Sequence, residues 1–270
     1  MAEKISTSEY YNEPSKCFVE PFEILPGLWY VGDMKVSAHL LDTGDGLILF
    51  DAGYPHAKHL LTEAIYRAGY NPNDIKYLII SHGHFDHTGA AVEYKNLYGC
   101  LIALGEADVK MIEERPELVL YDHSDSPYYV IPTADIALKD GHIIECGKAK
   151  IKCISTPGHT DGVMSFFFDW EGHKVGYFGG IGFNTMAPSY YEKYGITTDN
   201  AANLRASTLK VRDIEVDVVL GNHPGQTNTF GKMKRIGKEE GNPFVDPTEW
   251  AMFMDKLAVN VEKYIREENK

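Results

Sequence analysis

The sequence predicts an α/β fold in which two mixed β-sheets pack face to face and helices cover both outer faces. Two observations support this prediction. Short apolar runs typical of buried strands alternate with segments of helical periodicity, in both halves of the 270-residue chain. No repeat, linker or low-complexity stretch separates the halves. We therefore expect one αββα domain over residues 22–270, after a polar N-terminal arm over residues 1–21 that has little order of its own.

The first half contains the clearest strands. Leu47–Phe50 and Tyr77–Ile80 are uninterrupted apolar runs, as expected for strands covered on both faces. Between them, apolar residues recur at helical spacing over 57–68. The other elements expected here are strands over 28–31, 36–41 and 101–104, with helices over 89–97 and 106–114.

The second half begins with a different pattern of secondary structure. Residues 134–180 are expected to form mostly strands, separated by turns at Asp140-Gly141 and Glu171-Gly172. A helix over 201–211 and an apolar strand over 216–220 follow. Pro247 is in position to start a long closing helix over 248–268. Loops are expected over 111–134 and 183–198, where tyrosines could line a pocket or lie on the surface (Tyr121, Tyr128, Tyr129, Tyr190 and Tyr191).

Composition excludes some classes of protein. The chain has 26 Lys+Arg and 39 Asp+Glu, a formal charge of −13, which disfavours nucleic acid and anionic membranes as partners. No run of about 18 apolar residues is present, so we expect no membrane-spanning helix. The four cysteines form no CxxC pair, and no apolar leader follows the first residues. We expect a cytoplasmic protein (periplasmic if a leader was removed) that acts on a small molecule, with its oligomeric state open.

Histidines cluster after the second of the buried strands. His82, His84 and His87 fall within six residues, together with Asp86. Alternate residues of an extended segment point the same way, so His82 and His84 can converge on one point. Asp86 and His87 follow where the chain begins to turn, and they can face a second point nearby. Imidazole and carboxylate ligands suit zinc, with iron or manganese as alternatives.

Two further histidines share this context. His159 and His223 each lie in a loop rich in Gly and Pro, directly after an apolar strand. Functional side chains concentrate on such loops, so both are expected metal ligands. The remaining histidines are expected to be structural or solvated: His39 in the core, His56, His59, His142 and His173 in polar positions, and His123 in a loop from which it could reach the site.

The pattern HxHxDH after a strand, then a histidine in Thr156-Pro-Gly-His-Thr160 and a late histidine in a loop, resembles the metal-binding pattern of the metallo-β-lactamase superfamily. The likeness extends over residues 22–268 and includes the phrase Phe50-Asp-Ala-Gly53. It implies the metallo-β-lactamase fold and two zinc ions per chain. His82, His84 and His159 would hold the first ion, Asp86, His87 and His223 the second, and Asp51 would steady a ligand.

One difference from the superfamily pattern indicates which subgroup the chain resembles. Many hydrolases of the superfamily carry an aspartate that bridges both metals, and Gly180 stands in its place here. Three histidines plus Asp-His-His is similar to the third subclass of the class B β-lactamases. So are the phrases Val36-Ser-Ala-His39, Gly83-His-Phe-Asp-His-Thr-Gly89 and Asn242-Pro-Phe-Val-Asp-Pro247.

The resemblance implies a zinc-dependent hydrolase in which hydroxide attacks a carbonyl and Asp86 orients the hydroxide and transfers protons. The leading expectation is hydrolysis of the β-lactam amide, the activity that gives antibiotic resistance. The alternative is a cytoplasmic metallo-hydrolase of lactones, thioesters or phosphodiesters. A diiron oxidoreductase would need the missing bridging aspartate, and a non-catalytic relative would be expected to have lost some of the six ligands.

Overall fold

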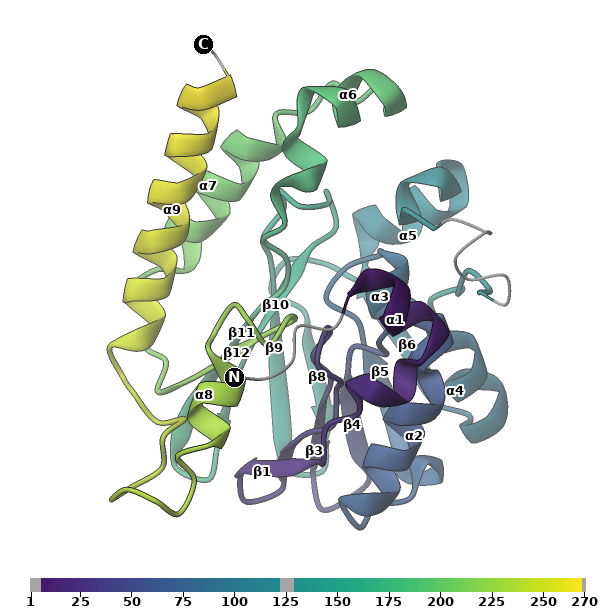
Figure 1. Cartoon of the computed structure of the whole chain (residues 1–270), viewed down its shortest axis with the longest axis vertical. Coiled ribbons are helices and arrows are strands. Elements are labelled where there is room, and N and C mark those ends of the chain that lie inside the picture. Colours follow the sequence, from purple (N-terminus) through teal and green to yellow (C-terminus); the bar gives the residue numbers. More distant parts are fainter. Residues whose placement is uncertain (1–5, 122–128, 269–270) are drawn as a thin grey trace.

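The computed structural model describes residues 6–121 and 129–268, and it has the expected αββα layers (Figure 1). One sheet has seven strands in the order β1 to β7 along the chain. Strands β1 to β4 pair antiparallel and β4 to β7 pair parallel, so the sheet is mixed. Its strands are β1 Phe22–Leu25, β2 Leu28–Tyr30, β3 His39–Asp42, β4 Leu47–Phe50, β5 Ile75–Ile79, β6 Leu101–Gly105 and β7 Ile136–Leu138.

The second sheet has five strands in the order β12-β11-β10-β9-β8. Only β11 and β12 pair parallel, so this sheet is mixed as well. Its strands are β8 Ile143–Cys146, β9 Ala149–Ser155, β10 Met164–Trp170, β11 His173–Phe178 and β12 Val218–Gly221. Between the two sheets lies an apolar core in which Phe50 stacks on Phe168 with ring centroids 5.7 Å apart.

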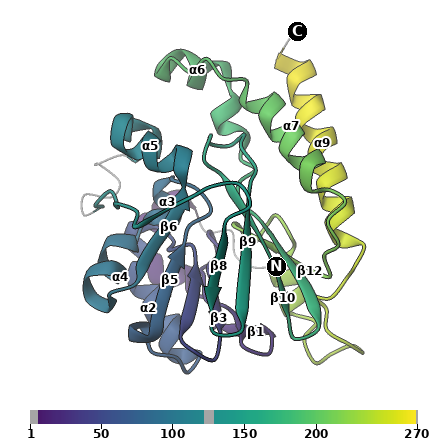
Figure 2. The same cartoon turned by 180° about the vertical axis from the view of Figure 1, so that it is seen from behind.

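Helices cover both outer faces (Figure 2). On the seven-stranded sheet, α2 (Lys58–Arg67), α4 (Ala91–Tyr98) and α5 (Glu106–Glu114) contribute to one apolar cluster. On the five-stranded sheet, α7 (Asn200–Val211) packs along α9 (Glu249–Glu268). None of the helices in the described ranges combines the length and apolar character needed to cross a bilayer.

Several elements differ from the expectation. The strand expected over 36–41 begins only at His39, because the Asp33 carboxylate accepts from the backbone of Lys35 and Val36 and holds a turn there. Short helices occur where none was expected: α6 (Pro188–Tyr194) lies in the loop expected over 183–198, and α3 (Phe85–Thr88) and α8 (Thr229–Met233) lie outside the expected elements.

The N-terminal arm is more ordered than expected. It contains α1 (Thr7–Asn12), which begins at Ser6 with a capping box completed by Glu9, and a 3₁₀ turn over Pro14–Cys17. Tyr10 and Cys17 are buried against Ala57 and Leu60. The segment is polar overall, so its composition did not indicate that Tyr10 and Cys17 would fix it to the domain.

Candidate metal centre

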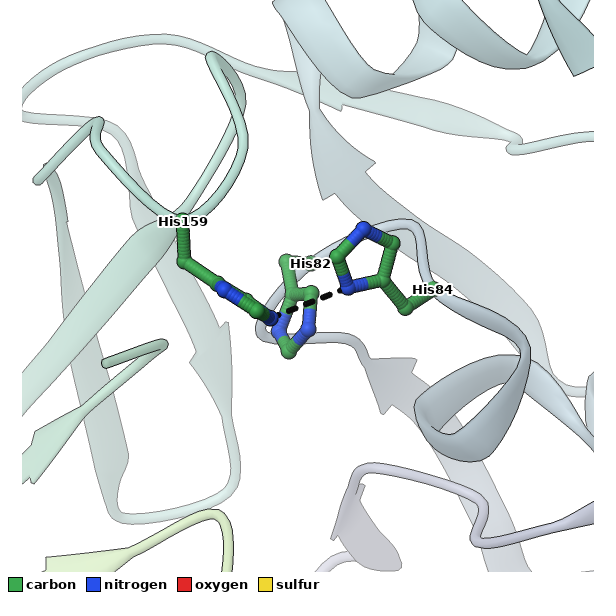
Figure 3. A group of neighbouring side chains, drawn as sticks. All are labelled: His82, His84 and His159. Atoms are coloured by element: carbon green, nitrogen blue, oxygen red, sulfur yellow. Dashed lines mark hydrogen bonds between the residues drawn. The ribbon is translucent and has the colours of Figure 1, made fainter. Parts of the chain in front are cut away.

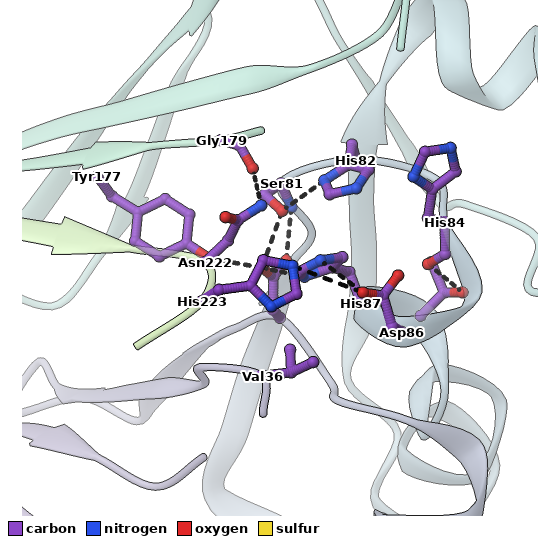
Figure 4. A network of polar contacts seen from close by, with 12 residues as sticks. Val36, Ser81, His82, His84, Asp86, His87, Tyr177, Gly179, Asn222 and His223 are labelled. Carbon is purple, nitrogen blue, oxygen red and sulfur yellow. Dashed lines mark hydrogen bonds and ion pairs between the residues drawn. The ribbon is translucent and has the colours of Figure 1, made fainter. Parts of the chain in front are cut away.

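The six expected ligands converge at one end of the sandwich. His82 and His84 follow β5, and Asp86 and His87 lie on the short helix α3 directly after them. The loops that follow β9 and β12 in the other sheet supply His159 and His223. Both sheets therefore contribute to the centre, as Figures 3 and 4 show.

His82, His84 and His159 form the first group (Figure 3). All three are buried, and each offers a ring nitrogen within 4.8 Å of the others. The Nδ1 of His84 lies 3.0 Å from Nε2 of His159. The Nε2 of His82 is buried and has no hydrogen-bond partner among the described residues. Three nitrogens thus face one small space.

Asp86, His87 and His223 form the second group (Figure 4). The Oδ2 of Asp86 lies 3.3 Å from Nε2 of His87 and 3.6 Å from Nε2 of His223. The Nε2 of His87 is buried without a hydrogen bond of good geometry. Two ligands bound about 2.0–2.1 Å from a tetrahedral zinc ion lie about 3.3 Å apart, so the separations in both groups suit such an ion.

Hydrogen bonds select the tautomer of four of the five rings. The Nδ1–H groups of His87, His159 and His223 donate to Asp51 Oδ2, the Gly182 carbonyl and the Lys35 carbonyl, at 2.9, 2.8 and 2.9 Å. The Ser81 hydroxyl has one hydrogen and donates it to Asp51, so its oxygen accepts from Nδ1–H of His82. In the neutral form of each of these four rings, the lone pair of Nε2 therefore faces the centre, as a metal ligand requires.

The three histidines of the first group are uncharged, which suits them to bind a cation. Burial, reinforced by the neighbouring imidazoles, lowers the pKa of His82 and His84 well below the ordinary value. Burial also lowers the pKa of His159 to about 4. These rings are neutral at pH 7 and have no proton to lose before they bind a metal.

The second group carries the charges. Burial opposes ionisation of Asp86, but the positive charge of the adjacent His87 ring, together with that of His223, outweighs burial and holds the pKa of the carboxyl well below its usual range. Burial would likewise lower the pKa of His87, but the carboxylates of Asp86 and Asp51 outweigh it and raise that pKa to about 10. In the absence of metal, His87 is a cation between two anions, a place that a metal ion can take.

Asp51, which was expected to steady a ligand, accepts several hydrogen bonds beneath the centre. Its Oδ1 accepts from the backbone of Ser81 at 2.7 Å, and its Oδ2 accepts from Tyr177 Oη at 2.5 Å as well as from His87. The residue has φ +60°, in the left-handed region that Asp tolerates better than most side chains. The backbone at Asp51 thus turns its carboxylate under the ligand loop.

Asp108 is a supporting residue that no sequence motif indicated. It is buried at the start of α5, and its Oδ2 accepts from Gly83 N and Thr160 Oγ1, both at 2.7 Å. Its Oδ1 accepts from Gly162 N at 2.9 Å. The carboxylate therefore joins the loop that carries His82 and His84 to the loop that carries His159. Burial raises the pKa of Asp108 to about 6.

Gly180 packs against His159. A Cβ at Gly180 would lie 3.2 Å from the His159 ring, and one at Gly182 only 2.6 Å from it. A cavity of about 240 Å³ opens over the centre, lined by four of the expected ligands and by Tyr54, Phe85, Leu120, Ile181, Gly182, Asn184, Asn222 and Gln226. A second cavity of about 330 Å³ is lined in part by His159 and Tyr190.

The other histidines among the described residues lie outside the centre. His39 is buried, as expected, although its Nδ1 has no partner among the described residues. His56 was expected to be solvated, but it packs between the rings of Tyr10 and Tyr11. His59 is exposed, and His142 and His173 are half-buried. His123 and Tyr128 lie outside the described residues.

The fold and this site define a class of protein, and the family comparison agrees. Residues 31–223 match the model of the metallo-beta-lactamase superfamily. The chain belongs to that superfamily and is a hydrolase.

Solved structures resemble nearly the whole chain. The native FEZ-1 metallo-beta-lactamase from Legionella gormanii is 25% identical and superposes with a TM-score of 0.83, covering 94% of this chain and 98% of that one. BJP-1, a subclass B3 metallo-beta-lactamase of Bradyrhizobium japonicum, is 24% identical, with a TM-score of 0.82 over 94% of this chain and 96% of that one. The resemblance to the third subclass is therefore confirmed.

Curated relatives by sequence have other activities. The hydroxyacylglutathione hydrolase GloC of Haemophilus influenzae is 27% identical over 64% of this chain and 77% of its own length. An N-acyl homoserine lactonase from a Bacillus species is 26% identical over 52% of this chain. The match spans 60% of the lactonase. Membership of the superfamily thus leaves the substrate to be argued from the site.

Proposed function

We propose that this chain is a dizinc hydrolase that opens β-lactam rings. His82, His84 and His159 would hold one zinc ion, and Asp86, His87 and His223 the other. The observation that carries the proposal is the set of inward-facing donors. Ligand atoms of six side chains from both sheets face one another in two adjacent groups, and Gly180, packed on His159, supplies no bridging side chain. The likeness of the subclass B3 fold over 94% of the chain supports the same assignment.

Zinc held at these positions would polarise the amide carbonyl and supply a hydroxide nucleophile near neutral pH. The residues of the chain have complementary roles. Asp86, ionised at pH 7, can accept a proton from the nucleophile and return it to the leaving nitrogen. The side chains of Asn184 and Tyr54 line the same cavity and can donate hydrogen bonds to an oxyanion there.

Metal content and activity test the proposal together. We expect the purified protein to hold two zinc ions per chain and to hydrolyse nitrocefin or a carbapenem. The double variant His82→Ala/His84→Ala should lose that activity because it removes two of the three ligands of the first group. Tyr66→Phe, a change at a tyrosine that is half exposed on α2, is the control and should retain both properties. The absence of any tightly bound transition metal at neutral pH would refute the proposal.

A neutral lactone is a second candidate, and one observation favours it. No Lys or Arg occurs among the described residues that line the cavity over the centre, whereas β-lactam antibiotics carry a carboxylate. The similarity to N-acyl homoserine lactonases points the same way. A panel of nitrocefin, a carbapenem, an N-acyl homoserine lactone, a thioester and a bis-aryl phosphate separates the candidates. Turnover of the lactone alone would replace the β-lactam assignment and leave the metal centre unchanged.

A further inference from the structure

The N-terminal segment Ser6–Cys17 makes contacts that lead to the metal centre. We propose that Tyr10, acting through Asp33 and the Lys35 carbonyl, is a positioning residue for His223 and so tunes the affinity of the second zinc site. The inference rests on the proposed dizinc function, because it concerns how tightly one of the two groups holds its ion.

His223 depends on a neighbouring loop for its orientation. Its side chain is 36% exposed, whereas the side chain of His87 in the same group is fully buried. The one hydrogen bond of its ring that the structure assigns runs from Nδ1–H to the Lys35 carbonyl at 2.9 Å. The preceding residue is held by the same loop, since the Ser37 N–H donates to the Asn222 carbonyl at 2.9 Å. Residues 33–37 are therefore the support on which His223 rests.

Asp33 is the centre of that loop. Its Oδ1 accepts from the backbone N–H groups of Lys35 and Val36, at 2.7 and 2.9 Å, which fixes the direction of the Lys35 peptide. Its Oδ2 accepts from Tyr10 Oη at 2.5 Å, and its own carbonyl accepts from Tyr30 Oη at the same distance. Asp33 is only 6% exposed. Without the Tyr10 hydroxyl, a buried carboxylate oxygen loses its donor and the loop loses a constraint.

The N-terminal segment is seated firmly enough to transmit this constraint. The Tyr10 ring meets the rings of Tyr54 and His56 edge-on, with centroids 5.2 and 4.5 Å apart. The Cys17 carbonyl accepts from Met34 N at 3.0 Å, so the segment also holds the loop by its backbone. Tyr54 lines the cavity over the centre, which places the segment directly behind one wall of the site.

The first group is held by other residues. His82 donates to Ser81, and His159 donates to the Gly182 carbonyl. His84 faces His159. None of these contacts involves residues 6–17 or 33–37. A change at Tyr10 should therefore act on one zinc site and leave the other unchanged, an asymmetry that general loosening of the protein would not produce.

Zinc titration of the holoprotein against a chromophoric chelator tests the proposal, since it resolves the two dissociation constants without use of a substrate. We expect Tyr10→Phe to raise the dissociation constant of one of the two ions about tenfold, as loss of a supporting contact behind a metal ligand commonly does. Asp33→Asn, which keeps the size of the side chain, should act in the same direction. Tyr66→Phe is the matched control and should bind both ions as the parent does.

A background without His223 identifies the affected site. In the His223→Ala protein, we expect Tyr10→Phe to change the affinity of the remaining ion less than twofold, because the ring that Tyr10 positions is gone. Equal weakening of both ions, or an undiminished effect in that background, would overturn the proposal. A parent that binds two ions with Tyr10→Phe and Asp33→Asn unchanged would overturn this inference alone, whereas a parent that binds none would overturn the proposed function.

Discussion

Each imidazole at the centre has two ring nitrogens, and the partner of one decides what the other can do. A carbonyl or carboxylate that accepts from Nδ1–H leaves Nε2 with its lone pair, as in His87, His159 and His223. His84 is the exception, since its Nδ1 faces His159 and its Nε2 is buried without a partner among the described residues. The geometry of single side chains thus distinguishes a candidate ligand set from histidines that merely lie close together.

His39 has the opposite character, because it is buried and takes no part in the centre. Burial lowers its pKa from 6.5 to about 3. Between these values the unfolded state binds the extra proton and the folded state does not, so stability falls as pH falls below 6.5. We expect wild type to lose about 1.4 kcal/mol per pH unit in this window relative to His39→Leu. Urea unfolding at pH 7.0 and pH 5.5 measures the difference.

The control for that experiment is His59→Leu, because His59 is exposed on α2. Its stability relative to wild type should change little between the two pH values. A His39→Leu protein that loses stability in parallel with wild type on acidification would show that His39 does not carry the effect.

Asp108 shows how one side chain can join several elements. It lies on α5 and accepts hydrogen bonds from Gly83, Thr160 and Gly162. These residues belong to loops that follow strands of the two different sheets. Asp108→Ala leaves three donors without this acceptor, although it also removes a buried charge. We expect a net loss of about 2–4 kcal/mol in the free energy of unfolding, measured by urea denaturation. Asp161→Ala removes an exposed carboxylate between Thr160 and Gly162 and should cost less than about 0.5 kcal/mol. An equal loss in both variants would contradict the role of Asp108 in joining these loops.

Sequence patterns predicted the elements that are dominated by burial. The apolar runs at Leu47–Phe50 and Tyr77–Ile80 correspond to β4 and β5 because strands covered on both faces must be apolar throughout. Helices α6 and α8 were not predicted, since α6 has no buried face and α8 has only five residues. The candidate ligands stood out because they follow buried strands. Asp108 and Asp33 did not. Most of their partners are backbone groups, which leave no sequence signal, and their side-chain partners Thr160 and Tyr10 are remote in sequence.

At the scale of the whole molecule, the centre is a junction between the two sheets. Loops after β5 bring His82, His84, Asp86 and His87, and loops after β9 and β12 bring His159 and His223. Each proposed zinc ion would therefore be held by both halves of the sandwich, and separation of the sheets would have to break ligand bonds. Metal binding should stabilise the fold as a whole rather than one loop.

Thermal unfolding tests this coupling. An ion present at 100 times its dissociation constant stabilises the folded state by about 2.7 kcal/mol, and in a chain of this size each kcal/mol moves Tm by about 2–4 °C. We expect chelation to lower the Tm of wild type by about 5–10 °C per ion removed. The variant His159→Ala/His223→Ala keeps the four ligands of one sheet and loses both of the other, so its Tm should respond to the chelator by a small fraction of that amount. A full response in this variant would mean that zinc is held by the His82–His87 segment alone, and that the metal does not stabilise the packing of the two sheets against each other.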